Sequence, residues 1–393
     1  MMPEKSTSIA VFSFAYEPFE GGAEIAIREI VHRLPMFRFT VLTARFSPMS
    51  IADEAKENVR IVRLGSPTKR RYGLLFKKIG YVFRAWRAAE ALHAQERFEA
   101  IWVVMASYGG IAALLFKMNH PRIPMLVTLQ EGDSEKHLTR GKLGLVGLFG
   151  RLLIRNAEYI QVISGYLRDF ALMQGAQVPI EIVPNGVDEE LFATEYTDAQ
   201  KKALREYLDI KDEYVVLTTS RLVRKNGVDI LINAVAEFAE KNPLIKCIIA
   251  GGGPERKRLE KLIRKRGLEG KVVLAGQVAQ HDLPLYFAVA DIFVRASRSE
   301  GLGSSFLEAM AAGVPVIGTP VGGIVDFLKD GETGFVARPE DPHGVALKMA
   351  EILENRKQTD HVVRQAQALI HRNYSWETVA RMMRNIFDKL INL

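Results

Sequence analysis

Residues 290–328 contain the densest group of side chains that could do chemistry. The segment reads ADIFVRASRSEGLGSSFLEAMAAGVPVIGTPVGGIVDFL, and seven residues separate Glu300 from Glu308 in it. Carboxylates accept hydrogen bonds from hydroxyl groups, and backbone N–H groups donate to phosphate oxygens. Two carboxylates beside a glycine-rich loop therefore suit a ligand that carries both hydroxyl and phosphate groups, such as a sugar nucleotide.

The apolar pattern of this segment predicts the elements that position the two carboxylates. We expect a buried strand at 292–294, a loop at 295–303, a helix at 304–312 and a second strand at 314–317. Each strand-to-helix loop would present free N–H groups and a positive helix end at the carboxyl edge of the sheet, which favours an anionic group such as a diphosphate. The glycines that would let the backbone approach such a ligand are Gly301, Gly303, Gly322 and Gly323.

Short apolar segments alternate with amphipathic segments of helix length along the whole chain. This alternation is typical of βαβ units on a parallel sheet. It forms two series, separated near residues 184–213, where a Pro-Asn-Gly turn leads into a charged stretch. We therefore predict an α/β protein with two doubly wound domains facing a central cleft, with boundaries at 1–183, 184–374 and 375–393. The last of these segments has the pattern of a capped helix with one apolar face.

Length and composition exclude several classes of protein. The chain has 393 residues, of which 48% are hydrophobic and 25% are charged, as in folded globular proteins. A single cysteine excludes an internal disulfide framework, and it favours a reducing compartment such as the cytosol. The apolar run at 9–14 reads as a first strand because it is too short for a signal peptide. The longest uncharged stretch, 100–116, is too short to span a membrane and reads as strand, turn and helix.

The segment EGLGSSFLEAMAAGVPVI resembles the E-x7-E motif of the retaining GT-B glycosyltransferases of family 4 (glycosyl transferases group 1). Further segments resemble the same family in the same order along the chain. They are GGAE at 21–24, VPNGVD at 183–188, SRLVRKNGVDILINA at 220–234, IAGGGPERKRLEKL at 249–262 and VLAGQV around Gly276. The resemblance covers most of the chain. It implies the GT-B fold, with the final helix returning to the first domain.

The resemblance also implies a role for each matching residue. Glu300 would hold the hydroxyls of the donor sugar, Glu308 would hold the ribose of the nucleotide, and Arg221 and Lys225 would clamp the diphosphate. Fixed cations at that point stabilise the charge that develops on the departing phosphate. The residues expected to contact the donor mainly through their backbone are Gly21, Gly22, Gly252, Gly253, Gln277, Val278, Gly301, Leu302 and Gly303.

Two positions depart from the family pattern. The family usually has a histidine after an apolar strand of the first domain, and Gln130 stands at the matching position here. Glutamine cannot titrate, so the neighbouring Glu131 and Asp133 are candidates to take that role on the acceptor side, with Asn185 at the hinge. The clamp lysine of the family often directly precedes a glycine. Asn226 occupies that place in this chain, and Lys225 is the favoured cation with Arg224 as the alternative.

We expect neither a metal ion nor another cofactor. The sequence has no Asp-x-Asp triplet, which single-domain glycosyltransferases use to hold a divalent cation on the diphosphate. The glycines at 251–253 lack the third glycine of a dinucleotide-binding fingerprint, because Arg256 stands in its place. The histidines lie in separate segments without the spacing of metal ligands.

The first 183 residues hold 24 Lys or Arg against 17 Asp or Glu, whereas the remainder is balanced at 29 against 29. Two stretches, 58–89 and 136–157, contain no acidic residue and mix basic with large apolar side chains. Their basic parts, at 69–87 and 140–155, suit the surface of an anionic membrane or, alternatively, helices packed on a sheet with their cations in water. No stacking platform or recognition motif favours nucleic acid.

We therefore expect a glycosyltransferase that moves a sugar from a UDP- or GDP-sugar to a lipid-linked or glycan acceptor. By the resemblance, transfer keeps the anomeric configuration and needs no metal ion. A role in cell-envelope or exopolysaccharide synthesis, and a cytoplasmic location with peripheral membrane contact, complete the prediction. The alternatives are a non-catalytic protein that binds nucleotide sugars, and another enzyme on the same fold, such as a sugar-nucleotide epimerase or a phosphorylase.

Overall fold

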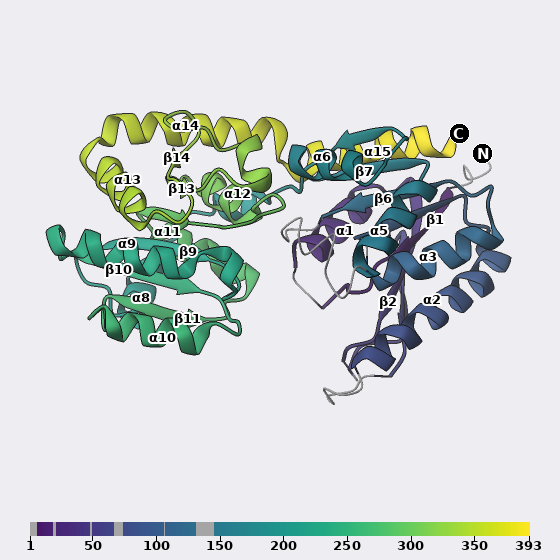
Figure 1. Ribbon diagram of the computed structural model, residues 1–393, viewed down its shortest axis with the longest axis horizontal. Helices are drawn as coiled ribbons and strands as arrows, with labels where there is room; N and C mark the ends of the chain where they lie inside the picture. The colour runs from purple at the N-terminus through teal and green to yellow at the C-terminus, as the bar shows by residue number, and fades with distance from the viewer. Residues whose placement is uncertain (1–5, 19–20, 48, 67–73, 106, 131–144) are drawn as a thin grey trace. The chain divides into compact units, whose positions relative to one another are not determined.

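The computed structural model describes residues 6–18, 21–47, 49–66, 74–105, 107–130 and 145–393, with side chains omitted at 74–77 and 145–147. Contacts within the chain divide it into two compact units (Figure 1). The first unit comprises residues 1–185 together with Trp376–Leu393, and the second comprises Gly186–Ser375.

An eight-stranded sheet forms the centre of the first unit, in the order β3-β4-β2-β1-β5-β6-β7-β8. All neighbouring strands are parallel except β3, which pairs antiparallel with β4. The elements of this unit are β1 (Thr7–Phe12), α1 (Gly22–Arg33), β2 (Phe37–Ala44), β3 (Asp53–Lys56), β4 (Val59–Leu64), α2 (Leu74–Glu96), β5 (Ala100–Val104), α3 (Tyr108–Asn119), β6 (Met125–Leu129), α5 (Leu145–Asn156), β7 (Tyr159–Val162), α6 (Gly165–Met173), β8 (Ile180–Ile182) and α15 (Trp376–Ile391).

A six-stranded parallel sheet forms the centre of the second unit, in the order β11-β10-β9-β12-β13-β14. Its elements are α7 (Glu189–Phe192), α8 (Asp198–Tyr207), β9 (Tyr214–Thr219), η3 (Arg224–Asn226), α9 (Val228–Lys241), β10 (Ile245–Ala250), α10 (Arg256–Lys265), β11 (Val272–Gly276), η4 (Gln280–Asp282), α11 (Leu283–Ala288), β12 (Ile292–Arg295), α12 (Ser304–Ala311), β13 (Val316–Gly318), η5 (Gly322–Asp326), β14 (Phe335–Val336), α13 (Pro342–Glu354) and α14 (Arg356–Asn373). The helices labelled η are 3₁₀ helices.

Both sheets reverse their strand order at one point, between β1 and β5 in the first and between β9 and β12 in the second. Doubly wound sheets bind ligands outside the carboxyl ends of the strands at such a reversal, because the loops on either side turn away in opposite directions. The predicted class of two doubly wound α/β domains is therefore confirmed, and the second reversal lies between the strands that precede Arg221 and Glu300.

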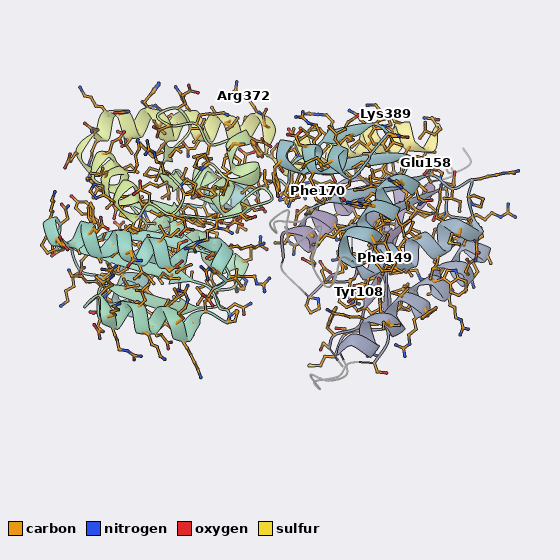
Figure 2. The ribbon with its side chains drawn as sticks, viewed as in Figure 1. Tyr108, Phe149, Glu158, Phe170, Arg372 and Lys389 are labelled. Carbon is orange, nitrogen blue, oxygen red and sulfur yellow. The ribbon has the colours of Figure 1, made fainter. Side chains whose placement is uncertain are left out.

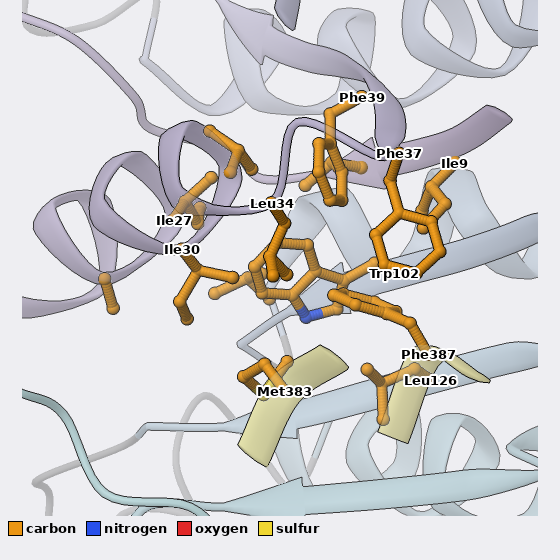
Figure 3. Close-up of a cluster of buried hydrophobic side chains, with 14 of the residues drawn as sticks. Ile9, Ile27, Ile30, Leu34, Phe37, Phe39, Trp102, Leu126, Met383 and Phe387 are labelled. Carbon is orange, nitrogen blue, oxygen red and sulfur yellow. The ribbon is translucent and has the colours of Figure 1, made fainter. Parts of the chain in front are cut away.

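The last helix, α15, belongs to the core of the first unit, as predicted. Phe387 packs its ring 5.3 Å from Trp102, 5.6 Å from Phe37 and 5.8 Å from Phe39 between centroids, and Met383 is buried in the same cluster (Figure 3). Each such aromatic pair adds about 0.5–1.5 kcal/mol to the free energy of unfolding, beyond the contribution from burial of apolar surface. At the rim, Nζ of Lys389 lies 2.5 Å from Oε1 of Glu181 in β8; Lys389 is labelled in Figure 2.

The second unit buries different side chains on the two faces of its sheet, as the alternation along β12 requires. Ile292 and Val294 join the cluster that α9, α10 and α13 cover. Phe293 points the other way, where its ring lies 5.8 Å from Phe287 of α11 and 5.4 Å from Phe306 of α12. The helix that carries Glu308 is therefore held against the sheet by aromatic packing at its first turn.

The first strand is shorter at its carboxyl end than predicted. The first strand ends at Phe12 and not at 14, because the chain turns at Ser13, whose hydroxyl donates to the carbonyl of Ala15 at 2.7 Å. The charged stretch near 184–213 contains a regular helix, α8. Its start is fixed by a capping box in which Thr197 and Gln200 satisfy each other's backbone N–H groups.

Candidate active site

The loops after β9, β12 and β13 bring most of the predicted donor residues to one edge of the second sheet. Arg221 and Lys225 follow β9, whereas Glu300 follows β12 and Glu308 lies in α12. This edge is the carboxyl edge at the point where the strand order reverses. The predicted sugar, ribose and phosphate contacts therefore lie on adjacent loops of one domain.

Two glycines allow these loops to pack directly on one another. Gly227 has a φ of +66°, and a Cβ atom there would lie 1.7 Å from the carbonyl oxygen of Ala296. Gly322 has a φ of +55°, and its Cβ would lie 1.8 Å from the carbonyl oxygen of Glu300. That same carbonyl accepts a hydrogen bond from the N–H of Gly323 at 3.2 Å. Any larger residue would push the three loops apart, so the glycines fix the backbone of Glu300.

The side chain of Glu300 is mostly buried and is paired with Arg295, the last residue of β12, which precedes the loop that carries Glu300. Its Oε2 lies 2.5 Å from Nη2 of Arg295, and the two side chains are 13% and 11% exposed. This contact is an ion pair, and Oε2 has no hydrogen-bond partner among the described residues. A carboxylate held in this way keeps acceptor capacity for hydroxyl groups of a ligand.

Glu308 is partly buried in α12, and its carboxylate has no hydrogen-bond partner among the described residues. Desolvation raises the pKa of Glu308 to about 7, and the positive charge of Arg295 opposes this shift. A raised pKa at an unpaired carboxylate is typical of functional sites, because a structural carboxylate is normally stabilised by a partner. A diol that donates to Glu308 would supply the missing hydrogen bonds.

The two predicted cations differ in exposure. Arg221 is exposed directly after β9, whereas Lys225 is partly buried within η3. Backbone hydrogen bonds hold this loop, since the N–H of Arg298 donates to the carbonyl of Lys225 at 2.7 Å. The Nδ2 of Asn226 donates to the carbonyl of Arg221, also at 2.7 Å. Both cations therefore extend from a fixed backbone at the edge that holds Glu300.

Buried polar atoms without a hydrogen-bond partner gather at this edge. In the described part of the second unit, all such side-chain atoms lie at or just after the carboxyl ends of β9 and β12, the two strands at the reversal. They belong to Thr219, Ser220, Arg295, Ser297 and Glu300. Buried polar groups are nearly always hydrogen-bonded in folded proteins, and exceptions call for a local explanation. A polar ligand bound at the reversal would supply hydrogen bonds to all of these atoms, which would explain why they gather there.

Other predicted donor residues lie at neighbouring strand ends of the same sheet. Gly252 and Gly253 follow β10, and the carbonyl of Gly252 accepts from the N–H of Leu222 at 2.9 Å. Gln277 and Val278 directly follow β11, where Gln277 is exposed.

The loop residues Gly301, Leu302 and Gly303 are buried, and Gly303 caps α12 with a φ of +97°. Two of these residues have no side chain and that of Leu302 is buried, so only the backbone of this loop faces the edge of the sheet. The structure thus gathers the donor residues predicted for this domain along one edge of its sheet.

In the first unit the structure brings together Gln130, Asn185 and Gly22. The Nδ2 of Asn185 donates to Oε1 of Gln130 at 3.2 Å and approaches the carbonyl of Gly22 at 3.5 Å. Asn185 is buried, so it fixes the end of β6 to the start of α1. Glu131 and Asp133 lie outside the described residues.

The amino end of α1 is already filled by a carboxylate of its own helix. The backbone N–H groups of Gly21 and Glu24 donate to the Glu24 carboxylate, and burial raises the pKa of that group above its usual range. A Cβ atom at Gly21 would lie within 2.3 Å of Glu24 Oε2, so glycine is required for this arrangement. A phosphate that used these N–H groups would have to displace Glu24.

The sequence motifs did not point to Arg295, which contacts Glu300, Ser305 and Asn226. One sequence feature could have identified it: an arginine directly follows a run of apolar strand residues, and a cation buried there needs a partner. Within the described ranges, no group of three or more His, Cys, Asp or Glu side chains is placed to hold a metal ion.

Comparison with known proteins agrees with the fold and with the motifs. Residues 199–369 match the family model of the glycosyl transferases group 1, and residues 21–186 match that of the glycosyl transferase 4-like domain. The chain belongs to this family of glycosyltransferases. The suspected resemblance is thereby confirmed for both halves of the chain.

Named relatives include lipid-modifying enzymes. The chain is 31% identical over 236 residues to a GDP-mannose-dependent alpha-(1-6)-phosphatidylinositol monomannoside mannosyltransferase of Mycolicibacterium smegmatis. That match covers 58% of this chain and 61% of the relative, so it spans about three fifths of the relative's length. The chain is also 25% identical to the alpha-monoglucosyldiacylglycerol synthase of Acholeplasma laidlawii, over 83% of this chain and 84% of that one.

Solved structures support the fold assignment. Sucrose-phosphate synthase from Thermosynechococcus elongatus superposes with a TM-score of 0.82 at 22% identity, covering 98% of this chain and 99% of that one. The Anabaena protein Alr3699/HepE, solved with UDP and glucose, superposes with a TM-score of 0.78 at 20% identity, covering 98% and 100%. At these identities the likeness establishes the GT-B type of fold alone.

Proposed function

We propose that this chain transfers a sugar from a nucleoside-diphosphate sugar, with uridine or guanosine as its base, to a lipid-linked or glycan acceptor. The observation that supports the proposal is the group of buried polar atoms without a hydrogen-bond partner at the reversal of the second sheet, which includes Oε2 of Glu300. A sugar nucleotide has hydroxyl groups for the two carboxylates and phosphate oxygens for the cations that follow β9.

In the proposed mechanism the donor lies along the carboxyl edge of the second sheet. Glu300 accepts from the hydroxyls of the sugar, and Glu308 accepts from the ribose. Arg221 and Lys225 stabilise the negative charge that grows on the diphosphate as the glycosidic bond breaks, and this stabilisation is larger in the transition state than in the ground state. These cations take the role that a divalent metal has in other transferases, so the proposal includes no metal ion or other cofactor.

We further propose that transfer retains the anomeric configuration and that the departing phosphate accepts the proton of the acceptor hydroxyl on the same face of the sugar. This step needs no carboxylate nucleophile. Two named relatives support a lipid-linked acceptor, because one acts on a phosphatidylinositol mannoside and the other forms a glucosyldiacylglycerol. Cell-envelope or exopolysaccharide synthesis in the cytoplasm, at the inner face of the membrane, is the setting that we propose.

Incubation with radiolabelled UDP-glucose or GDP-mannose and a membrane lipid extract tests the proposal. We expect labelled glycolipid to form with one of the two donors, and we expect the anomeric proton of the product to keep the configuration of the donor by NMR. Binding of the donor without either transfer or slow hydrolysis would instead favour a non-catalytic binding protein. Conversion of the donor to an isomeric sugar nucleotide would favour an epimerase.

Membrane contact is proposed from the exposed faces of α2 and α5 in the first unit. On α2, the apolar side chains of Ile79 and Phe83 are exposed next to the exposed Arg84 and Arg87. Ile79, Phe83 and Arg87 recur every four residues, and Arg84 precedes Arg87 by three, so these side chains lie on one side of the helix. Within the described residues no helix is both long and apolar enough to cross a membrane. This face suits adsorption to an anionic surface, where apolar and basic side chains act together.

The second of these helices, α5, repeats the combination. Leu148 and Leu152 are exposed, and so are Arg151 and Arg155. Phe149 is labelled on this helix in Figure 2. Both helices thus offer exposed apolar side chains beside arginines.

We expect the protein to sediment with vesicles that contain phosphatidylglycerol and not with vesicles of phosphatidylcholine alone. The Arg84→Ser/Arg87→Ser variant should lower the partition coefficient about 30-fold, since each basic residue near an anionic surface contributes about 1 kcal/mol. A matched control is Arg356→Ser/Arg364→Ser, which removes two exposed arginines from α14 of the second unit. Equal losses in the two variants would contradict a role for the α2 face.

A further inference from the structure

Arg295 occupies an unusual place for a cation. It is the last residue of β12, which forms one side of the reversal in the second sheet, and its side chain is only 11% exposed. Burial of an arginine in a parallel sheet costs free energy unless its N–H groups have partners. The partners of these N–H groups therefore indicate what the buried guanidinium does at this position.

Three elements converge on the one guanidinium group. Its Nη1 donates to Oγ of Ser305, in the first turn of α12, at 2.6 Å. Its Nη2 donates to Oδ1 of Asn226, at the end of η3, at 3.3 Å. The same Nη2 lies 2.5 Å from Oε2 of Glu300 in the glycine loop. The planar fork of arginine can contact several partners in fixed directions, whereas the single ammonium of lysine cannot.

Asn226 extends the connection to the predicted phosphate clamp. Its Oδ1 accepts from Arg295, while its Nδ2 donates to the carbonyl of Arg221 at 2.7 Å. Asn226 is itself buried and follows Lys225 directly. Arg295 thus links the carboxylate that is expected to hold the sugar with the loop that carries both cations.

The charge of Arg295 also matters to the buried carboxylates. Glu300 pairs with it directly, and its positive charge favours ionised Glu308 against the effect of burial. Without Arg295 the two carboxylates would share a mostly desolvated site with no adjacent cation from β12, and such an uncompensated charge is costly. A neutral side chain at this position would therefore let Glu300 move or take up a proton.

We propose that Arg295 is the positioning residue of the donor site, which orients Glu300 toward the donor sugar and fixes the clamp loop through Asn226. This inference rests on the proposed function. Arg295 acts through Glu300 and Asn226 and not by touching the substrate. Its effect should therefore appear in the step that depends on sugar orientation more than in affinity for the nucleotide.

A double-mutant cycle with Glu300 tests this role. Turnover is measured as release of nucleoside diphosphate from UDP-glucose or GDP-mannose, and affinity is measured by calorimetry with UDP and GDP. We expect Arg295→Met to lower kcat about 100-fold, the loss that a misplacement of about 1 Å can cause. Arg295→Lys should recover part of this loss, since it restores the charge without the fork. The Kd for the nucleoside diphosphate should change less than about fivefold.

The losses of kcat caused by Arg295→Met and by Glu300→Gln should not be additive. If Arg295 acts mainly through Glu300, the loss of kcat in Arg295→Met/Glu300→Gln should be far smaller than the product of the two single losses, and only the part that Asn226 transmits to the clamp loop should remain. Additive losses would overturn the proposal, and so would wild-type kcat in Arg295→Met. If Arg295→Met does not fold, the same cycle is run with Arg295→Lys, and additivity there has the same meaning.

Lys246→Met is the matched control for loss of a buried cation. Lys246 lies in β10 with its side chain 3% exposed, and its Nζ donates to the carbonyl of Asp209 at 2.6 Å, near the amino end of the strand. We expect this variant to lower the melting temperature without lowering kcat. An equal loss of kcat there would mean that any buried charge defect inactivates the domain, which contradicts a specific role for Arg295. A wild-type protein that neither binds nor turns over any sugar nucleotide would instead refute the proposed function itself.

Discussion

Replacement of Glu300 by glutamine is expected to lower the turnover of the sugar nucleotide by about 100-fold or more, with little change in affinity for the nucleoside diphosphate. Glutamine has nearly the same shape, but it loses the negative charge that, in the proposed mechanism, accepts from the sugar hydroxyls in the transition state. Loss of one preorganised electrostatic contact of this kind costs about 10²–10³ in kcat. UDP and GDP lack the sugar, so their binding by Arg221, Lys225 and Glu308 should persist.

Glu340→Gln is the matched control for this variant. Glu340 is a more exposed carboxylate of the same domain, and it pairs with Arg298 instead of Arg295. Steady-state kinetics and calorimetry on both variants should show a loss of kcat for Glu300→Gln only. Wild-type turnover in Glu300→Gln would remove Glu300 from the site, and a parallel loss of nucleotide affinity would place its role in ground-state binding.

Replacement of Glu308 by glutamine is expected to stabilise the free protein at pH 8 by about 3 kcal/mol. Burial raises the pKa of Glu308 from 4.5 to about 7 in the native state. Between these two values the native protein keeps a proton that the unfolded chain has lost. The stability from this group is therefore full below about pH 4.5 and is lost as the pH rises through 7. A difference of about 2.5 pKa units corresponds to about 3 kcal/mol.

Thermal unfolding of the two proteins at about pH 4.5 and pH 8 measures this effect. The variant should melt roughly 6–12 °C higher than the wild type at pH 8, and the two should nearly coincide at the lower pH. Glu240→Gln in α9 changes an exposed helical carboxylate and should show no such dependence on pH. A variant that is less stable than the wild type at pH 8 would contradict the buried, unpaired state of Glu308.

The gain in stability should be accompanied by a loss of function. We expect Glu308→Gln to bind the sugar nucleotide about 10- to 100-fold more weakly, since hydrogen bonds to a charged group contribute about 1.5–3 kcal/mol. Active sites commonly keep groups that lower stability in this way. Calorimetric titration with the sugar nucleotide at pH 8 measures the change in Kd. Unchanged affinity would show that Glu308 does not contact the donor.

The periodicity of the sequence was enough to predict the architecture, because buried parallel strands and amphipathic helices have distinct patterns. The expected strand at 292–294 is β12, and the expected helix at 304–312 is α12. The second expected strand, at 314–317, begins two residues later as β13. The N–H of Val314 is bonded to the carbonyl of Ala309, so this residue still completes the end of the helix. Local hydrogen bonds of this kind decide boundaries, and apolar patterns do not record them.

The motifs also located the donor residues at one sheet edge, but the sequence could not reveal how they are connected. Arg295 was expected as the first residue of a loop. It is instead the last residue of β12, paired with Gly318 of β13, and its mostly buried side chain finds an acceptor in Asn226, 69 residues earlier. Glu308 could equally have been a solvated helix carboxylate. Only the packing of α12 on the sheet shows that it is unpaired, since burial depends on contacts between distant segments.

Thermal unfolding of the metal-free protein with single nucleotides tests the central claim most directly. The ligands are UDP, GDP, ADP and NAD, each with and without EDTA. A ligand at about 100 times its Kd that binds only the native state should stabilise it by about 2.7 kcal/mol, which is a shift of several degrees. We predict a shift with UDP or GDP that EDTA does not change. No shift with any uridine or guanosine nucleotide, or a shift with NAD alone, would contradict a sugar-nucleotide site at the second sheet.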